Sequence, residues 1–227
     1  MNTQPIKPIF WLWIPTIWMV GQLAAEALIP NEALLDFHRE NGLHEWLQFA
    51  MLVAVFGLAC KLLFQMDRKA NIWLTAWIIA AALGSFYVAA EEISWGQWIF
   101  QWATPEEWQA LNYQGETNLH NTSRWLNQIP RTLLEVGILI GGIIIPTVKY
   151  FKPKWVPKRF EIIYPPNILM VTALICAGAK FGQKICKMHF DCRIFQRASE
   201  VEELYLFFFV LLYMIILQAR ILGSKKP

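Results

Sequence analysis

The chain has 227 residues, of which 56% are hydrophobic and only 16% are charged, and its formal net charge is +3. Soluble domains carry about 25% charged residues, so this chain is too apolar to be one, and its small net charge argues against a nucleic-acid-binding domain. Gly and Pro occur 12 times each, which excludes collagen-like and disordered chains. The composition therefore predicts an all-α, polytopic transmembrane helix bundle that forms a single integral membrane domain over residues 1–227.

Apolar runs along the chain predict about six membrane spans. A helix needs about 20 apolar residues to cross roughly 30 Å of hydrocarbon. Runs that approach this length lie at residues 9–29, 43–64, 72–90 or longer, 132–148, 166–179 and 201–222. The fifth run is the shortest and ends before Lys180. The first run has an alternative interpretation as a cleaved signal peptide, but its length and its tryptophans favour a membrane span.

The distribution of charge predicts the orientation in the membrane. With six spans and both termini on one side, that side holds twelve of the twenty Lys and Arg residues but only Asp67 and Glu161 among the acids. Short loops rich in Lys and Arg stay in the cytoplasm, so we expect both termini to be cytoplasmic. The other fifteen acids and all four His then lie on the outer side, where we expect the polar chemistry. Residues 149–159 are basic and are interpreted as this topology signal, with a cytoplasmic docking site as the alternative.

Glu91 and Glu92 are the acids that most need an explanation. They follow nineteen uncharged residues, 72–90, and precede another mostly apolar run. Two adjacent carboxylates in or near the membrane are costly, and such residues typically mark a functional site. Neighbouring helical residues point about 100° apart, so we expect one Glu, together with Trp95 at i+3 or i+4, to face the bundle interior. The alternative is contact with interfacial water or with Arg124 or Arg131.

A polar segment at residues 112–121 provides further candidates. Glu116 and His120 are four residues apart, so in a helix they would share a face and could bind one divalent metal, with Glu92 as a further ligand, or act as a base with its orienting carboxylate. The alternative is an outer loop whose side chains bond their own backbone. Asn118 and Asn121 belong to the same segment.

Other polar residues have structural or supporting interpretations. Thr104–Pro105–Glu106 predicts the start of a short outer interfacial helix near 105–111, and Thr132 and Ser199 are expected to begin the fourth and sixth spans. His44 and Glu45 at the outer start of the second span, together with Gln97, are candidate supporting groups. The small-residue pattern of Gly137, Gly141 and Gly142 predicts close helix packing within the bundle or in a homo-oligomer.

Cys186 and Cys192 lie in the predicted outer loop between the fifth and sixth spans. An oxidising outer compartment makes them a candidate disulfide, with free thiols or a metal site as alternatives. A C-x5-C spacing is not a strong zinc signature.

Three segments together resemble a group of uncharacterised bacterial multi-pass membrane proteins. They are Glu91-Glu92-Ile-Ser-Trp-Gly-Gln97, then Thr104-Pro105-Glu106, then Asn112-x-Gln-Gly-Glu-x-Asn-Leu-His-Asn121. The resemblance covers about thirty residues and extends to the Gly-Leu-x-Glu-Trp-Leu-Gln pattern around Glu45. It implies a bacterial inner membrane and supplies no activity. This chain departs from the pattern at Trp98, where such proteins carry a basic residue.

Two main hypotheses follow for the function. One is a membrane enzyme, a metal-dependent hydrolase or transferase with Glu91, Glu92, Glu116 and His120 at its centre and a lipid or lipid-linked substrate. The other is a non-enzymatic subunit or assembly factor of a larger membrane complex. A proton-coupled transporter that uses the Glu pair is a third hypothesis, although no inverted repeat is visible.

Overall fold

The computed structural model describes residues 6–30, 42–112 and 115–223, and the described residues form helices without a β-strand. The long helices are α1 (Ile14–Leu28), α3 (Leu43–Gln65), α4 (Ile72–Glu92), α7 (Arg124–Ile138), α9 (Met170–His189) and α10 (Ala198–Gly223). Shorter helical segments are η1 (Ile9–Trp13), η2 (Ser94–Gly96), α5 (Gln97–Phe100), α6 (Glu106–Leu111), η3 (Leu139–Ile144), α8 (Ile145–Phe151), η4 (Pro153–Trp155), η5 (Lys158–Ile163) and η6 (Asn167–Leu169). The predicted all-α fold is confirmed.

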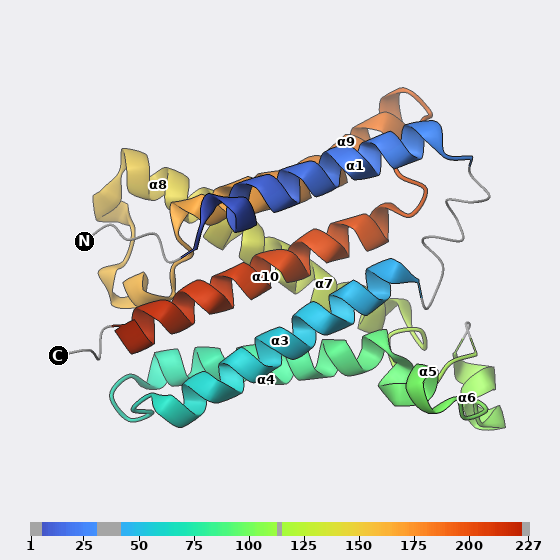
Figure 1. Ribbon diagram of the computed structural model, residues 1–227, viewed down its shortest axis with the longest axis horizontal. Coiled ribbons are helices and arrows are strands. Elements are labelled where there is room, and N and C mark those ends of the chain that lie inside the picture. Colours follow the sequence, from blue (N-terminus) through green and yellow to red (C-terminus); the bar gives the residue numbers. More distant parts are fainter. Residues whose placement is uncertain (1–5, 31–41, 113–114, 224–227) are drawn as a thin grey trace.

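Five helices in the described part of the chain are long and apolar enough to cross a membrane. They are Leu43–Gln65, Ile72–Glu92, Trp125–Phe151, Asn167–His189 and Ala198–Gly223. The π-helical η1 and α1 follow one another without a break and form a further apolar segment, which packs on α9 (Figure 1). The chain is therefore a multi-pass membrane protein with about six spans. The short helix expected near 105–111 is present as α6.

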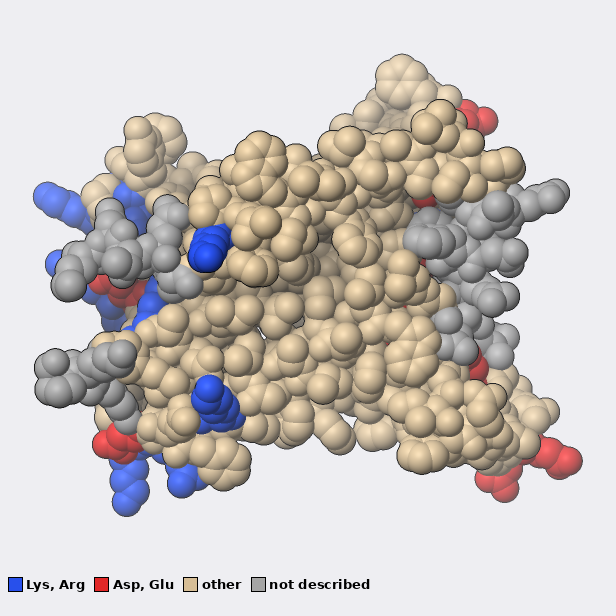
Figure 2. All heavy atoms as spheres, viewed as in Figure 1, with Lys and Arg blue, Asp and Glu red and all other residues tan. Residues whose placement is uncertain are grey.

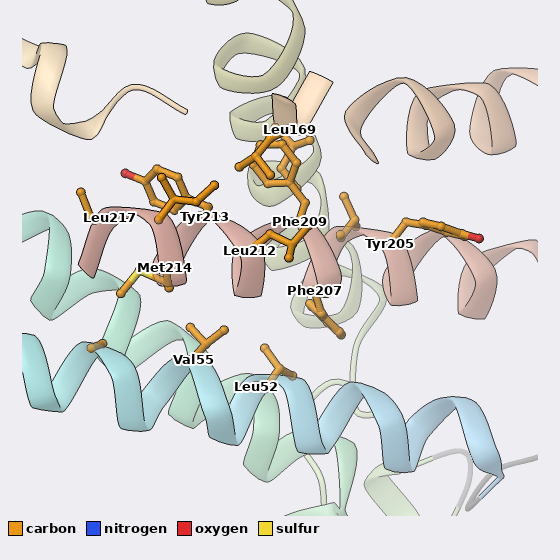
Figure 3. Packing of buried hydrophobic residues seen from close by; sticks show 14 of the residues in the cluster. Leu52, Val55, Leu169, Tyr205, Phe207, Phe209, Leu212, Tyr213, Met214 and Leu217 are labelled. Atoms are coloured by element: carbon orange, nitrogen blue, oxygen red, sulfur yellow. The ribbon is translucent and has the colours of Figure 1, made fainter. Parts of the chain in front are cut away.

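Helix α10 is the centre of the bundle. It packs on α9 and α3, and α3 packs on α4 (Figure 1). Its run Phe-Phe-Phe-Val-Leu-Leu-Tyr-Met-Ile-Ile-Leu is apolar on every side, which suits a helix that is surrounded by others. Leu52 and Val55 of α3 point toward Met214 and Phe207 of α10 (Figure 3).

Two predicted spans are longer than expected. The fourth does not begin at Thr132: α7 begins at Arg124, where the Ser123 side chain accepts the N–H of Leu126 at 3.2 Å. The fifth does not end before Lys180 but continues in α9 to His189. The start at Thr132 was expected from a capping pattern and the end of the fifth span from Lys180. Both Arg131 and Lys180 lie inside helices, where residues of other helices neutralise their charges, as described below.

The close helix packing expected from small residues occurs inside the bundle. A Cβ atom added to Gly142 would lie 2.7 Å from the Ala173 Cβ of α9 and 2.9 Å from the Phe209 ring of α10. At Gly141 the nearest atom would be a Pro165 ring carbon at 3.2 Å, whereas Gly137 meets nothing within 4 Å. Gly142 therefore lets η3 approach two neighbouring helices.

Charge is separated between the two ends of the bundle. Lys and Arg gather at the end where both chain termini lie, and acidic side chains are prominent at the other end (Figure 2). That second end holds the starts of α3, α7 and α10 and the ends of α4 and α9 (Figure 1), and we call it the cavity end.

Candidate active site

A cavity of about 610 Å³ lies at the cavity end, between α4, α7, α10, the α9–α10 connection and residues 116–121. Seven of the residues singled out in the sequence line it: Glu45, Glu91, Glu92, Glu116, Asn118, His120 and Asn121. The folded chain thus brings together groups that are separated by up to 76 positions. His44, Trp95 and Gln97 do not line the cavity but lie beside it.

Glu91 and His120 form the central contact of the site. The Glu91 Oε2 lies 3.1 Å from the His120 Nδ1 and also accepts the backbone N–H groups of Leu119 at 2.8 Å and His120 at 2.7 Å. The Trp95 Nε1 donates to Glu91 Oε1 at 2.5 Å. Glu91 is buried, whereas 30% of the His120 side chain is exposed. The Glu91 carboxylate therefore fixes both the backbone and the ring of His120.

A turn with an unusual backbone follows Glu91. Ser94, Trp95 and Gly96 have φ of 49°, 57° and 99°, so three consecutive residues lie in the left-handed region. Glycine adopts this region readily, but other residues do so at a cost. The turn ends α4 and directs the Trp95 indole back to Glu91. Trp95 is not on a shared helical face with Glu91, as the i+3 or i+4 spacing suggested, because the helix ends before it, and its side chain is 43% exposed. Strain of this kind is often found at functional sites.

Glu116 has a different environment from the one expected. The Ser94 hydroxyl and the Asn118 Nδ2 each donate to Glu116 Oε2 at 2.7 Å, and the Trp98 Nε1 donates to Oε1 at 3.2 Å. Residues 116–120 form a loop rather than a helix, so the i, i+4 argument for Glu116 and His120 does not apply. The carboxylate that orients His120 is Glu91, and Glu116 anchors its loop to the turn at 94–98.

Gln97 connects the same turn to the loop. Its Oε1 accepts the Thr117 N–H at 2.8 Å, and its Nε2 donates to the Thr104 hydroxyl at 2.7 Å. That hydroxyl donates to the Gly115 carbonyl at 2.5 Å, and the Asn112 Nδ2 donates to Asn118 Oδ1 at 2.8 Å. Side chains from the segments 91–97, 104–106 and 112–121 therefore hydrogen-bond to one another. These bonds hold His120 at the end of α4.

A second group of carboxylates faces the cavity from three helices. Glu45 of α3, Glu92 of α4, and Glu200 and Glu203 of α10 all line it and lie within electrostatic range of one another. The side chains of Glu91 and Glu92 thus face different neighbours. This agrees with their adjacent positions in a helix, where successive side chains point about 100° apart. In the sequence, Glu200 and Glu203 belong to the expected start of the sixth span at Ser199, and they were not among the candidate site residues.

Arg131 and Lys180 form a partly buried charge network with three acids. Arg131 contacts Glu135 at 3.0 Å, Glu202 at 2.5 Å and Glu203 at 3.0 Å. Lys180 pairs with Glu135 and lies 3.2 Å from Glu202. These contacts explain why α7 and α9 continue through charged residues. The i, i+4 spacing of Arg131 and Glu135 was the only sequence signal for the network.

The remaining predicted groups have structural surroundings. His44 is buried, with its ring centroid 6.4 Å from that of Trp18. Cys186 and Cys192 are joined as a disulfide, with Cα atoms 5.2 Å apart. Within residues 6–30, 42–112 and 115–223, no three His, Cys, Asp or Glu side chains are grouped so as to hold a metal ion.

No family model, no curated protein and no solved structure matches the chain. The site is therefore interpreted from its own geometry.

Proposed function

We propose that this chain is an integral membrane hydrolase or transferase that acts on a lipid or lipid-linked substrate, with His120 as its general base and Glu91 as the residue that positions it. The observation that carries the proposal is the contact between Glu91 and His120 Nδ1 at the wall of the cavity.

The hydrogen bonds of Glu91 define the role of the ring. Each of its four partners is an N–H or the Nδ1 of His120, so the carboxylate acts as an acceptor. In a neutral ring Nδ1 then carries the proton and donates it to Glu91, which leaves Nε2 as the basic nitrogen. A carboxylate that orients a His in this way supports removal of a proton from water or from a hydroxyl group.

Asn121 provides a second element of the site. It is 3% exposed and lines the cavity, and its Nδ2 has no hydrogen-bond partner among the described residues. A buried donor without a partner is costly. A substrate oxygen that becomes negative during reaction would satisfy it, as in an oxyanion hole.

The position and lining of the cavity support a lipid substrate. Val88, Leu126, Leu134, Leu206 and Phe207 provide apolar walls, beside the charged groups described above. The cavity lies where the spans reach one end of the bundle, so an amphiphile could place its chains along apolar helices and its head group at His120. Under the same proposal both termini lie in the cytoplasm of a bacterium, because the basic end carries them, and the cavity faces outward.

The experiment compares wild-type protein with His120→Asn in nanodiscs made from a bacterial polar lipid extract, and follows the lipids by mass spectrometry. We expect at least one lipid class to be converted by the wild type and not by His120→Asn. Glu91→Gln should lower the rate at saturating substrate by about 10²–10⁴-fold, the range of general-base contributions, without weakening lipid binding. His189→Asn, at the exposed end of α9, is the matched control and should keep full activity. Equal conversion by wild type and His120→Asn, or none by the wild type, would refute the proposal.

A further inference from the structure

Three cationic side chains line the cavity without a partner among the described residues. They are Lys187 in the last turn of α9, Arg193 in the α9–α10 connection, and Arg197 directly before α10, and we call them the rim cluster. In the part of the chain that the structure describes, none of them makes an ion pair or a side-chain hydrogen bond. Arg197 lies in the electrostatic field of Glu200 without contacting it. The rim cluster thus differs from Arg131 and Lys180, whose charges are neutralised by carboxylates.

The segment that carries the rim cluster is held in place on several sides. The disulfide joins the residue before Lys187 to the residue before Arg193. The Gln183 Oε1 accepts the N–H groups of Ile194 at 2.8 Å and of Phe195 at 3.1 Å, and Phe195 is buried. The Glu26 carboxylate of α1 accepts the N–H of Gln196. A ligand that binds the three cations therefore orders side chains but little backbone, which lowers the entropic cost of binding.

Two acids of the cavity, Glu200 and Glu203, lie in α10 close to Arg197, whereas the others come from different elements. The rim cluster belongs to the α9 side of α10, whereas Glu45 and Glu92 belong to α3 and α4 on its other side (Figure 1). An anionic group would be attracted by the rim and repelled by these acids. It would therefore be held at the rim while the rest of the substrate extends toward His120.

We propose that the rim cluster binds a phosphate group, and that the substrate at the site is an anionic, phosphate-bearing lipid or lipid-linked phosphate. This inference rests on the proposed function, because it names the substrate class of the same cavity. Arg and Lys donate several charge-assisted hydrogen bonds to phosphate oxygens, and these are among the strongest polar contacts in proteins. A neutral lipid would leave all three cations without a partner.

The test measures lipid binding apart from turnover. Delipidated protein in a non-ionic detergent is titrated with phosphatidylglycerol or with phosphatidylcholine of the same chain length, and native mass spectrometry counts the bound lipids. The variant Lys187→Gln/Arg193→Gln/Arg197→Gln is compared with Lys69→Gln/Lys154→Gln/Lys158→Gln. This control loses the same charge from exposed residues outside the cavity. All measurements are repeated in a His120→Asn background, where the proposed reaction is absent.

We expect the rim variant to bind phosphatidylglycerol at least about tenfold more weakly than the wild type, given the strength of charge-assisted contacts. The control variant should bind phosphatidylglycerol almost as well as the wild type. Binding of phosphatidylcholine should change little in either variant. An equal loss in both variants, or no loss in the rim variant, would overturn the inference. A third titration with inorganic phosphate distinguishes the source of the phosphate group. If inorganic phosphate stabilises the protein while phosphatidylglycerol binds no better than phosphatidylcholine, the lipid assignment is overturned. The ligand would then be a free phosphate compound.

The outcomes also separate the two proposals. Rim-dependent binding together with turnover that is independent of His120 would refute the proposed function and leave the phosphate site intact. Turnover that depends on His120 but tolerates the rim variant would refute only the phosphate site. Retention of a sharp gel-filtration peak by each variant establishes that it is folded.

Discussion

Substitution of Gly142 by Ala tests the packing of the bundle without reference to function. The added methyl group would lie 2.7 Å from the Ala173 Cβ and within 2.9 Å of the Phe209 ring, against an ordinary contact distance of about 3.5–4.0 Å. Neither neighbour can turn away easily, because Ala173 has no flexible side chain and Phe209 is buried in the core. The helices must therefore separate by up to about 1 Å, and overpacking of this kind costs about 1–3 kcal/mol.

The assay is thermal unfolding of the purified protein in detergent, followed by tryptophan fluorescence. Taking about 2–4 °C for each kcal/mol in a chain of this size, we expect Gly142→Ala to lower the Tm by on the order of 5 °C. Gly137→Ala is the matched control. It lies in the adjoining helix α7, and its new methyl group would meet nothing within 4 Å, so its Tm should stay the same or rise slightly. Equal shifts in the two variants would refute the packing argument.

Two further predictions concern the charged groups. Arg131→Gln leaves Glu203 without its cation and Glu135 and Glu202 with only Lys180, and should destabilise the protein by up to about 3–5 kcal/mol, the range for a buried pair. The exposed Arg68→Gln is the control, and a similar Tm for both variants would contradict the importance of the network. Glu116→Gln places an amide NH2 against either the Trp98 donor or the donors of Ser94 and Asn118, so it should cost about 1–3 kcal/mol and raise the rate of limited proteolysis in residues 99–119. Loss of turnover with unchanged proteolysis would instead assign Glu116 a role in the chemistry.

The arrangement of helices could be predicted largely from the sequence because each span is an apolar run of fixed minimum length. The errors occurred at the ends of two spans. Thr132 was taken as the start of a helix from its capping pattern and Lys180 as the end of one, yet Arg131 and Lys180 lie inside helices and are neutralised by acids from other helices. Sequence spacing gives contacts within one helix but not contacts between helices, so this pairing was not predictable.

The candidate site shows the same limit. Glu91 and His120 were both identified by their residue types and surroundings, but Glu116 was taken as the partner of His120 because four residues separate them. The actual partner lies 29 positions away, and the backbone N–H of His120 contributes to the contact. The cations at 187, 193 and 197 were missed because exposed Lys and Arg in a loop have no distinctive pattern. Only the fold shows that they share a cavity.

The left-handed turn at 94–96 implies a conflict between stability and activity. Glycine in place of Trp95 would relieve a backbone conformation that costs an L-residue roughly 1–2 kcal/mol. The same change would remove the indole that donates to Glu91, and Gly in place of Ser94 would remove the hydroxyl that donates to Glu116. Glycine at either position would therefore relieve the backbone but lose these hydrogen bonds, and at Trp95 also the ring contacts with Phe86 and Tyr87. The strained turn is retained because its side chains hold the site together and orient His120.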